Sequence, residues 1–320
     1  MATVTELPLD DVQLEESGHH RSNSLWRLTL RRLLRQRSAV IGLIILATLV
    51  FIAFAAPLIA PYSPTQNLIG IEDVARRESP CIHLLGCAAE NSQHLMGTDG
   101  NFRDVFSRII YGTRVSLRIG FLTVGFAIIV GTLLGAVSGY FGGWIGDVIM
   151  RILDVVLAFP FLLLAIAIVS VLGPGLTNAM LAIAIVTIPQ YARVVRASVL
   201  SVREMDYVEA SRALGASHAS LLFGRILPNA LPPLIVQGTL GIATAILDTA
   251  ALSFIGLGAQ PPMPEWGAML AEERNQVFSA PHLVFFPGLA IMITVLAFNL
   301  LGDGLRDALD PRLIEAGAKK

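Results

Sequence analysis

The stretch SVREMDYVEASRALGASHASLLFGRILPNALPP, residues 201–233, lies between two long apolar runs of the chain. It holds three arginines, two glutamates and one aspartate, although the whole chain is 54% hydrophobic and only 15% charged. A mean hydropathy of +0.67 is far above that of a soluble domain, and several apolar windows are long enough to cross a bilayer. We therefore expect an all-α integral membrane protein in which this stretch connects two membrane spans.

Six membrane spans can be placed along the chain. Three uncharged windows of 20 or 22 residues each reach about 30 Å at 1.5 Å per residue, and three shorter windows have 17 or 18 residues. The first window is longer than the apolar part of a signal peptide, so we expect it to remain as an anchor. Extended through their polar ends, the spans are expected at residues 39–60, 115–140, 147–172, 176–197, 230–258 and 283–302.

The arginines predict how the spans are oriented. With both termini inside, the cytoplasm receives 16 of the 23 Lys and Arg residues, which favours an N-in, C-in arrangement. Residues 201–228 then form a cytoplasmic loop, and residues 61–113 form an extracytoplasmic loop. The polar residues 1–24 are expected to be a disordered cytoplasmic tail, and residues 313–320 a second cytoplasmic tail.

The only two cysteines of the chain, Cys81 and Cys87, fall in the outer loop. In an oxidising compartment we expect them to form a disulfide, with two free thiols as the alternative. His83 lies between the two cysteines and His94 follows them, so that the four residues together are possible metal ligands. Because this spacing matches no standard zinc pattern, we expect no metal site here.

The chain lacks the residues that several classes of activity require. Its only lysines are Lys319 and Lys320, so a phosphate-binding loop of the G-x-x-x-x-G-K-[ST] kind is excluded. No nucleophile elbow, H-E-x-x-H motif or other catalytic constellation is present. The net charge of −1 and the lack of a basic stripe argue against nucleic acid as a partner. We expect a protein that is not an enzyme and that holds no cofactor of its own.

The charged stretch itself predicts a short helix. Asp206 can cap its start with Glu209 three residues later, in a capping-box arrangement, and Gly215 is the residue type expected just past its end. The helix would have about eight residues and a length of about 12 Å. On this spacing alone, an ordinary loop between two spans remains the alternative.

A second short helix should follow. Ser217 can cap it, and we expect it to run to Pro228, where the missing N–H and the ring clash would end it. Asn229 is then expected to cap the fifth span.

The run EASRALG at residues 209–215, followed by LP at 227–228, resembles the EAA motif of ABC importer permeases. Ser211 replaces the second alanine of that motif. The positions that match it are Glu209, Ala210, Gly215, Ile226 and Pro228. The resemblance implies that this segment is a coupling helix that docks into a cleft of an ATPase subunit. The residues expected to couple the chain to that ATPase are Asp206, Glu209, Ala210, Gly215 and Pro228.

Further blocks resemble the dipeptide and oligopeptide permeases, on the DppC/OppC-like side of their heterodimer. These blocks are MGTDGNFRDVFSRIIYGTRVSL (96–117), SGYFGGWIGDVIMRILDVVLAFP (138–160), ALSFIGLGAQPPMPEWGAML (251–270) and LAFNLLGDGLRDALDPR (296–312). The likeness covers about residues 25–312 and implies a type I ABC importer permease fold over that range. It also implies a bacterial or archaeal inner membrane as the location, with membrane lipid around the chain.

The implied partners are a homologous second permease, two ATPase subunits that bind ATP-Mg, and an extracytoplasmic peptide-binding protein. The expected function is ATP-driven import of dipeptides or oligopeptides. Within the same architecture nickel, glutathione or another small solute are alternatives. An ion-driven secondary transporter would normally show internal repeats, and none is evident.

One polar stripe in the fifth span points to a translocation pathway. Gln237, Gly241, Thr244 and Asp248 lie within about 60° of one another on a helix. A carboxylate facing lipid would cost roughly 2.5 to 3.5 kcal/mol on insertion scales, so Asp248 should face protein or water. We expect the stripe to line the pathway, and the alternative is that Asp248 only joins two helices.

Glycines recur every four residues in the second span, at Gly131, Gly135 and Gly139. This small-xxx-small spacing predicts close packing against another helix.

Overall fold

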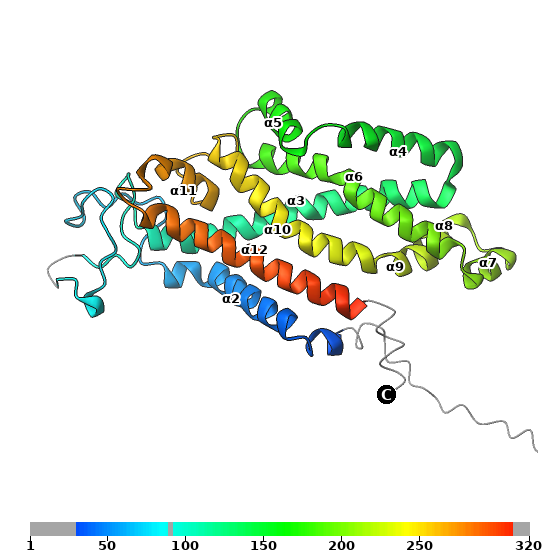
Figure 1. Ribbon diagram of the computed structural model, residues 1–320, viewed down its shortest axis with the longest axis horizontal. Coiled ribbons are helices and arrows are strands. Elements are labelled where there is room, and N and C mark those ends of the chain that lie inside the picture. The colour runs from blue at the N-terminus through cyan, green and yellow to red at the C-terminus, as the bar shows by residue number, and fades with distance from the viewer. Residues whose placement is uncertain (1–29, 89–91, 310–320) are drawn as a thin grey trace, which may run out of the picture.

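The computed structural model describes residues 30–88 and 92–309, and within those ranges nearly all regular structure is helical. The expected tails, residues 1–24 and 313–320, lie outside the described residues. Figure 1 shows an elongated bundle whose long helices run side by side along the longest axis of the molecule. The described part of the chain contains no strand, only two isolated β-bridges in the loop between the first two spans.

Five helices of the described residues are long and apolar enough to cross a membrane. A pair of shorter helices, α4 (Gly143–Leu157) and α5 (Phe161–Leu172), makes a sixth crossing if the two count as one span. The five long helices are α2 (Arg37–Ile59), α3 (Val105–Phe141), α6 (Leu176–Arg203), α10 (Pro232–Phe254) and α12 (His282–Leu309).

The third expected span, residues 147–172, differs from a straight helix. The axes of α4 and α5 are bent by 90° at a break that includes Pro160. Proline lacks an N–H, and it disfavours the helical conformation for the residue before it. An apolar window measures length but not direction, so the sequence reading missed this bend.

The second span is longer than the window that predicted it. Helix α3 has 37 residues, about 55 Å, and begins at Val105 rather than near residue 115. Its start is fixed by Asp104, whose carboxylate accepts a hydrogen bond from the backbone N–H of Ser107 at 2.7 Å. The helix therefore continues out of the apolar window into the extracytoplasmic side expected from the sequence.

Helix α3 packs closely against another helix, α6, as the glycine spacing predicts. A Cβ atom added at Gly131, Gly135 or Gly139 would overlap or press against α6, at Gly135 against the backbone of Ala192. Ala192 is itself fully buried. Because these three positions of α3 carry no side chain, the backbones of α3 and α6 can approach each other closely.

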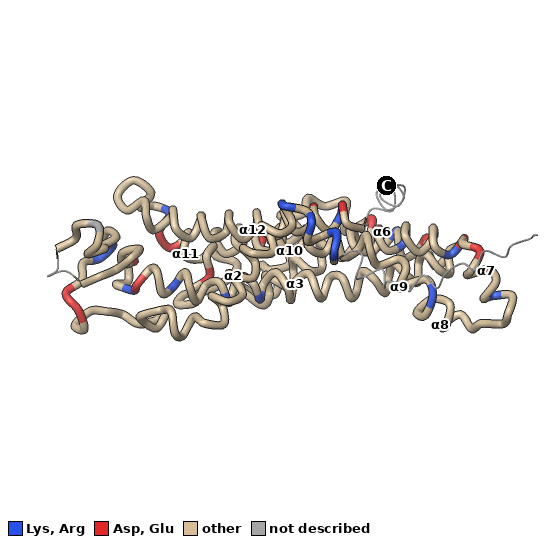
Figure 2. Tube along the Cα trace, turned by 90° about the horizontal axis from the view of Figure 1, so that it is seen from below, with Lys and Arg blue, Asp and Glu red and all other residues tan. Residues whose placement is uncertain are grey.

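The two ends of the bundle differ in content. One end holds the loop from residue 60 to 104 and a short helix, α11 (Trp266–Glu273), with single turns η1 (His83–Leu85) and η3 (Arg274–Gln276). The other end holds α7 (Asp206–Ala213), α8 (His218–Leu221), η2 (Leu222–Ile226) and α9 (Leu227–Ala230). Figure 2 shows both basic and acidic residues in each of these ends.

Candidate functional site

Helix α7 confirms the short helix predicted in the charged stretch. It has eight residues, and Gly215 follows its C-cap with a φ of +82°. The N–H of Ala216 bonds to the carbonyl of Ser211 at 3.1 Å, and the N–H of Gly215 to that of Arg212 at 3.0 Å. These two bonds make a Schellman motif, which requires the left-handed conformation that glycine adopts most easily.

The start of α7 differs from the prediction. Met205 occupies the N-cap with no side-chain bond, and Asp206 is the first helical residue. The expected capping box with Glu209 is therefore wrong. The spacing of the two acids is compatible with either start. The turn after α6, in which the N–H of Met205 bonds to the carbonyl of Val202, makes the helix begin one residue earlier than predicted. Asp206 in the first turn still complements the helix dipole.

Side chains of the loop tie α7 to the neighbouring helices. Val208 is fully buried in the core cluster that includes the end of α6. The Asn229 amide nitrogen donates to the Tyr207 hydroxyl at 3.0 Å and to the carbonyl of Arg225 at 2.6 Å. Asn229 lies within α9 and does not cap the fifth span, which begins after Leu231. That expectation was wrong, but the residue links α7 to the segment that leads into α10.

Pro228 does not end the second helix of the loop. Ser217 caps α8 as predicted, accepting from the N–H of Ser220 at 3.4 Å. The chain then passes through the π-turn η2 into α9, where Pro228 stands in the first turn. A proline is tolerated in a first turn because its missing N–H would have no partner there.

The outward face of α7 carries most of the residues expected to couple the chain to an ATPase. Asp206, Glu209 and Ala210 are exposed, and neither carboxylate has a hydrogen bond or ion pair within the described ranges. Leu214 is 88% exposed beside Gly215. The helix thus presents acids and one protruding apolar side chain at the end of the bundle.

The four residues of the expected pathway stripe on α10 do not share one environment in the structure. Thr244 is exposed, and Gln237 and Asp248 are half-buried. Gly241 instead faces α6, where an added Cβ would overlap the hydroxyl of Tyr191. Gly241 lies at the edge of the range of about 60° that the four stripe residues cover. The packing of α6 against α10 therefore decides that Gly241 is buried while the other three residues are not. Asp248 has no ion-pair partner in the part of the chain that the structure describes.

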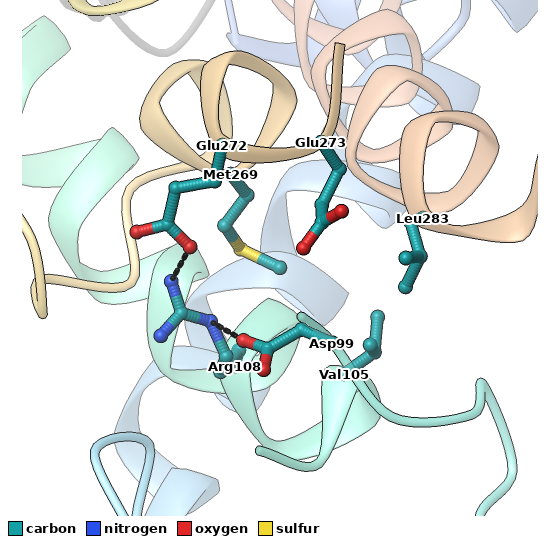
Figure 3. A pocket seen from close by; sticks show the side chains of 7 residues that line it. All are labelled: Asp99, Val105, Arg108, Met269, Glu272, Glu273 and Leu283. Carbon is teal, nitrogen blue, oxygen red and sulfur yellow. Dashed lines mark hydrogen bonds and ion pairs between the residues drawn. The ribbon is translucent and has the colours of Figure 1, made fainter. Parts of the chain in front are cut away.

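The loop between α2 and α3 is joined to α3 and α11 by ion pairs (Figure 3). Arg103 contacts Asp99 at 2.7 Å and Glu272 at 2.6 Å. Arg108, 1% exposed, lies 3.4 Å from the same Glu272 and 3.5 Å from Asp99. The cavity between these groups has a volume of only about 10 Å³. The ion-pair cluster therefore leaves no room for a ligand, and it holds the loop against the two helices.

A buried histidine lies in the same loop. His94 Nδ1 is 2.9 Å from Asp104, and Nε2 is 3.4 Å from Glu72, whose other oxygen accepts from the Tyr62 hydroxyl at 2.5 Å. The hydrogen bond with Asp104 raises the pKa of His94, and the nearby charges of Asp104, Glu72 and Glu78 act in the same direction against the effect of burial. His94 thus connects the loop to the start of α3.

Cys81 and Cys87 are joined in a disulfide, with their Cα atoms 5.4 Å apart. The pair closes a small ring that contains η1. His94, which lies near them in sequence, instead hydrogen-bonds to Asp104 and lies 3.4 Å from Glu72. Among residues 30–88 and 92–309 no group of three His, Cys, Asp or Glu side chains is arranged to hold a metal ion.

Tyr207 and Leu214 are residues that the sequence reading did not single out, and Asn229 was expected only to cap the fifth span. The four-residue spacing between Arg225 and Asn229 was a usable signal for their contact on one helical face. The contact with Tyr207, 22 residues earlier, had no local signal.

Comparison with known proteins places the chain among transport permeases. Residues 131–315 match the family model "Binding-protein-dependent transport system inner membrane component", and residues 24–80 match "N-terminal TM domain of oligopeptide transport permease C".

Three curated relatives illustrate this similarity. The chain is 49% identical to the dipeptide transport system permease protein DppC of Alkalihalophilus pseudofirmus, over 91% of both chains. It is 49% identical to the di/tripeptide transport system permease protein DppC of Pseudomonas aeruginosa, over 88% of this chain and 90% of the relative. It is also 46% identical to the glutathione transport system permease protein GsiD of Pectobacterium atrosepticum, over 90% of this chain and 91% of the relative.

Among solved structures, the chain is similar to the MetNI methionine ABC transporter in an inward-facing conformation. The TM-score is 0.53 at 20% identity, covering 64% of this chain and 97% of the other. At this identity the likeness concerns the fold alone.

Proposed function

Because the chain belongs to the family of binding-protein-dependent transport system inner membrane components, we propose that it is the permease subunit of an ATP-driven importer that moves dipeptides or oligopeptides into the cytoplasm. The observation that carries the substrate class is the 49% identity to two relatives named for dipeptide or di/tripeptide transport, over at least 88% of the chain. The partners are a homologous second permease, two ATPase subunits that bind ATP-Mg, and an extracytoplasmic peptide-binding protein. This chain contributes half of the pathway in the inner membrane.

The geometry of α7 supports the coupling role. Its exposed acids and Leu214 are free to meet an ATPase subunit, while Val208 and the bond from Asn229 to Tyr207 hold the helix to α6 and α9. A displacement of α7 is therefore transmitted to both helices that flank the loop. In this mechanism closure of the ATPase subunits on ATP moves α6 and α10, and the pathway face of α10 with Gln237, Thr244 and Asp248 becomes accessible from the other side.

The test is uptake by the reconstituted complex. The four partner subunits from the same organism are combined with this chain in proteoliposomes that contain ATP on the ATPase side. We expect uptake of a labelled dipeptide that depends on ATP and on the binding protein. Absence of uptake for all dipeptides and tripeptides tried, in a complex that hydrolyses ATP, would remove the peptide assignment.

Glutathione is a second candidate substrate, because a relative at 46% identity is named for glutathione transport. Competition decides between the two. If unlabelled glutathione suppresses dipeptide uptake at equal concentration, or is itself imported faster, the second candidate is favoured.

Orientation is part of the same proposal: α7 and both ends of the chain face the cytoplasm, and the disulfide loop faces outward. It is tested with a single cysteine at Ser217, in a chain whose two native cysteines are replaced by serine. We expect that a membrane-impermeant maleimide labels Ser217→Cys only after the cells are permeabilised. Efficient labelling in intact cells would reverse the orientation.

A further inference from the structure

We propose that Arg306, at the end of α12, receives the carboxylate of the transported solute in a cavity at the α7 end of the bundle. The cavity has a volume of about 850 Å³ and is walled by α6, α9, α10 and α12. Its polar lining consists of Ser198, Ser201, Asn229, Gln237 and Arg306. The inference rests on the proposed function, since it assigns a recognition site to a peptide that carries a free carboxylate.

The size and lining of the cavity suit a small solute. Its volume lies in the range of about 300 to 1,000 Å³ that is usual for small-molecule sites. The remaining wall is apolar and includes Pro233 and Leu240, and the polar groups stand at separate points of it. Such a lining gives nonspecific contact to varied side chains and directed contact to a few polar atoms.

The charge of the cavity selects for an anion. Among the described residues, Arg306 is the only charged one that lines it, and within the same ranges no ion pair or hydrogen bond engages Arg306. The neighbouring Asp307 accepts a hydrogen bond from Gln36 of the segment before α2 at 3.2 Å, which directs that carboxylate away. A guanidinium without a carboxylate partner presents the planar, two-pronged donor that a solute carboxylate fits.

One further group is available for the rest of a peptide. The amide nitrogen of Asn229 is used by Tyr207 and Arg225, so its oxygen remains an acceptor for a solute N–H. The same hydrogen bond links this site to α7, and thus connects the occupied cavity with the coupling helix.

The cavity and Asp248 lie on one helix. Gln237, which lines the cavity, and Asp248 are eleven residues apart on α10, about 16 Å. A solute with an amino group and a carboxylate therefore meets the carboxylate of Asp248 first, on the extracytoplasmic side. It then meets the guanidinium of Arg306, at the cytoplasmic end of the pathway. Two opposite charges in sequence favour a zwitterion over a solute with one charge.

The experiment compares a photoreactive dipeptide with its C-terminal amide. Both are offered from the α7 side to the complete complex in nucleotide-free proteoliposomes, and labelling of the peptide segments that contain residues 197–202 and 229–240 is measured by mass spectrometry. We expect the free acid to label these segments at least about fivefold more than the amide, as a solvent-accessible charged hydrogen bond allows. Arg306→Gln should reduce the acid to the level of the amide, and Arg306→Lys should retain part of the preference.

Two controls separate this inference from its alternatives. Asp303→Asn changes a charge one turn away on the same helix and should leave the preference unchanged. Equal labelling by acid and amide in the unaltered complex would overturn the inference even if Arg306→Gln fails to assemble. Rapid disulfide formation between Ser201→Cys and a cysteine in the second permease, in the same state, would also overturn it, because the cavity would then be filled by protein. A preference for the free acid in a complex that imports no peptide with ATP would instead contradict the proposed function.

Discussion

At the scale of single residues, the unpaired and the paired charges of this chain have different roles. Asp248 and Arg306 have no ion-pair partner in the described part of the chain, whereas His94 and Arg108 are enclosed by carboxylates. A charge without a protein partner near the bilayer needs water or a solute beside it. Enclosed charges stabilise one arrangement of the outer loop.

Asp248→Asn keeps the shape of the side chain and removes its charge. If Asp248 attracts the amino group of a solute, uptake of peptides with a free amino terminus should fall by about tenfold, the effect of losing about 1.4 kcal/mol of charge attraction. Assembly and basal ATP hydrolysis should be unchanged. Normal uptake, or failure of the complex to assemble, would show that Asp248 only joins helices.

The outer loop should lose stability as the pH rises. The pKa of His94 is raised above its ordinary value by the hydrogen bond to Asp104, so the stabilising contribution is complete below a pH of about 6.5 and is lost as the pH passes through the raised pKa. Hydrogen exchange of residues 92–104 should therefore quicken with rising pH beyond its intrinsic dependence. His94→Gln should abolish this excess, whereas His218→Gln, at the other end of the bundle, should leave it intact.

At the scale of elements, glycines decide both the end of α7 and the contact between α10 and α6. Gly215 provides a left-handed residue that closes the Schellman motif, with no atom within 4 Å of its missing Cβ. Gly241 has an ordinary helical conformation but no room, because Tyr191 lies against it. The first glycine is thus required for its backbone and the second for its lack of volume.

Gly215→Val should uncouple transport from ATP. A β-branched residue in the left-handed region costs about 1 to 2 kcal/mol, which is enough to displace the end of a two-turn helix. We expect ATP-driven uptake and co-purification of the ATPase subunits to be lost while the chain still inserts into the membrane. Gly215→Asn is the matched control, since asparagine tolerates this conformation and should retain most activity. Full uptake by the valine variant would argue against coupling through α7.

Gly241→Ala should loosen the packing of α10 on α6. The added methyl group would overlap the Tyr191 hydroxyl, and overpacking of this kind costs about 1 to 3 kcal/mol. Thermal unfolding of the purified complex should show a lower midpoint. The double variant with Tyr191→Phe should recover much of the loss, whereas Gly125→Ala, with open space around it, should have no effect. A lack of recovery in the double variant would contradict the assigned contact.

At the scale of the whole molecule, two joints at opposite ends act on the same helices. The cluster of Arg103, Arg108 and Glu272 holds α11 and the outer loop to the start of α3. The loop around α7 holds the end of α6 to the segment before α10. Since α3 packs closely on α6 at Gly131, Gly135 and Gly139, movement imposed at one end reaches the other through rigid helices.

Glu272→Gln should weaken the outer joint. It removes the carboxylate that two nearly buried arginines share, and breaking a buried pair costs about 3 to 5 kcal/mol. The unfolding midpoint should fall, and α11 should exchange hydrogen faster. Glu204→Gln removes an exposed partner of Arg203 and should lower the midpoint much less. Equal shifts in the two variants would show that the outer cluster is no more than surface charge.

The amino-acid sequence by itself determines the all-helical membrane class, most span positions, the eight-residue helix with Gly215 and the glycine contact in α3. Each of these depends on local spacing or on the length of an apolar run, which the chain carries without its folded neighbours. Only the tertiary structure decides the bend at Pro160, the register of Asp206, the direction of Gly241 and the placing of Arg306 in a cavity. These depend on which helix lies alongside, and contacts such as Asn229 with Tyr207 join residues whose distance along the chain says nothing about their distance in space.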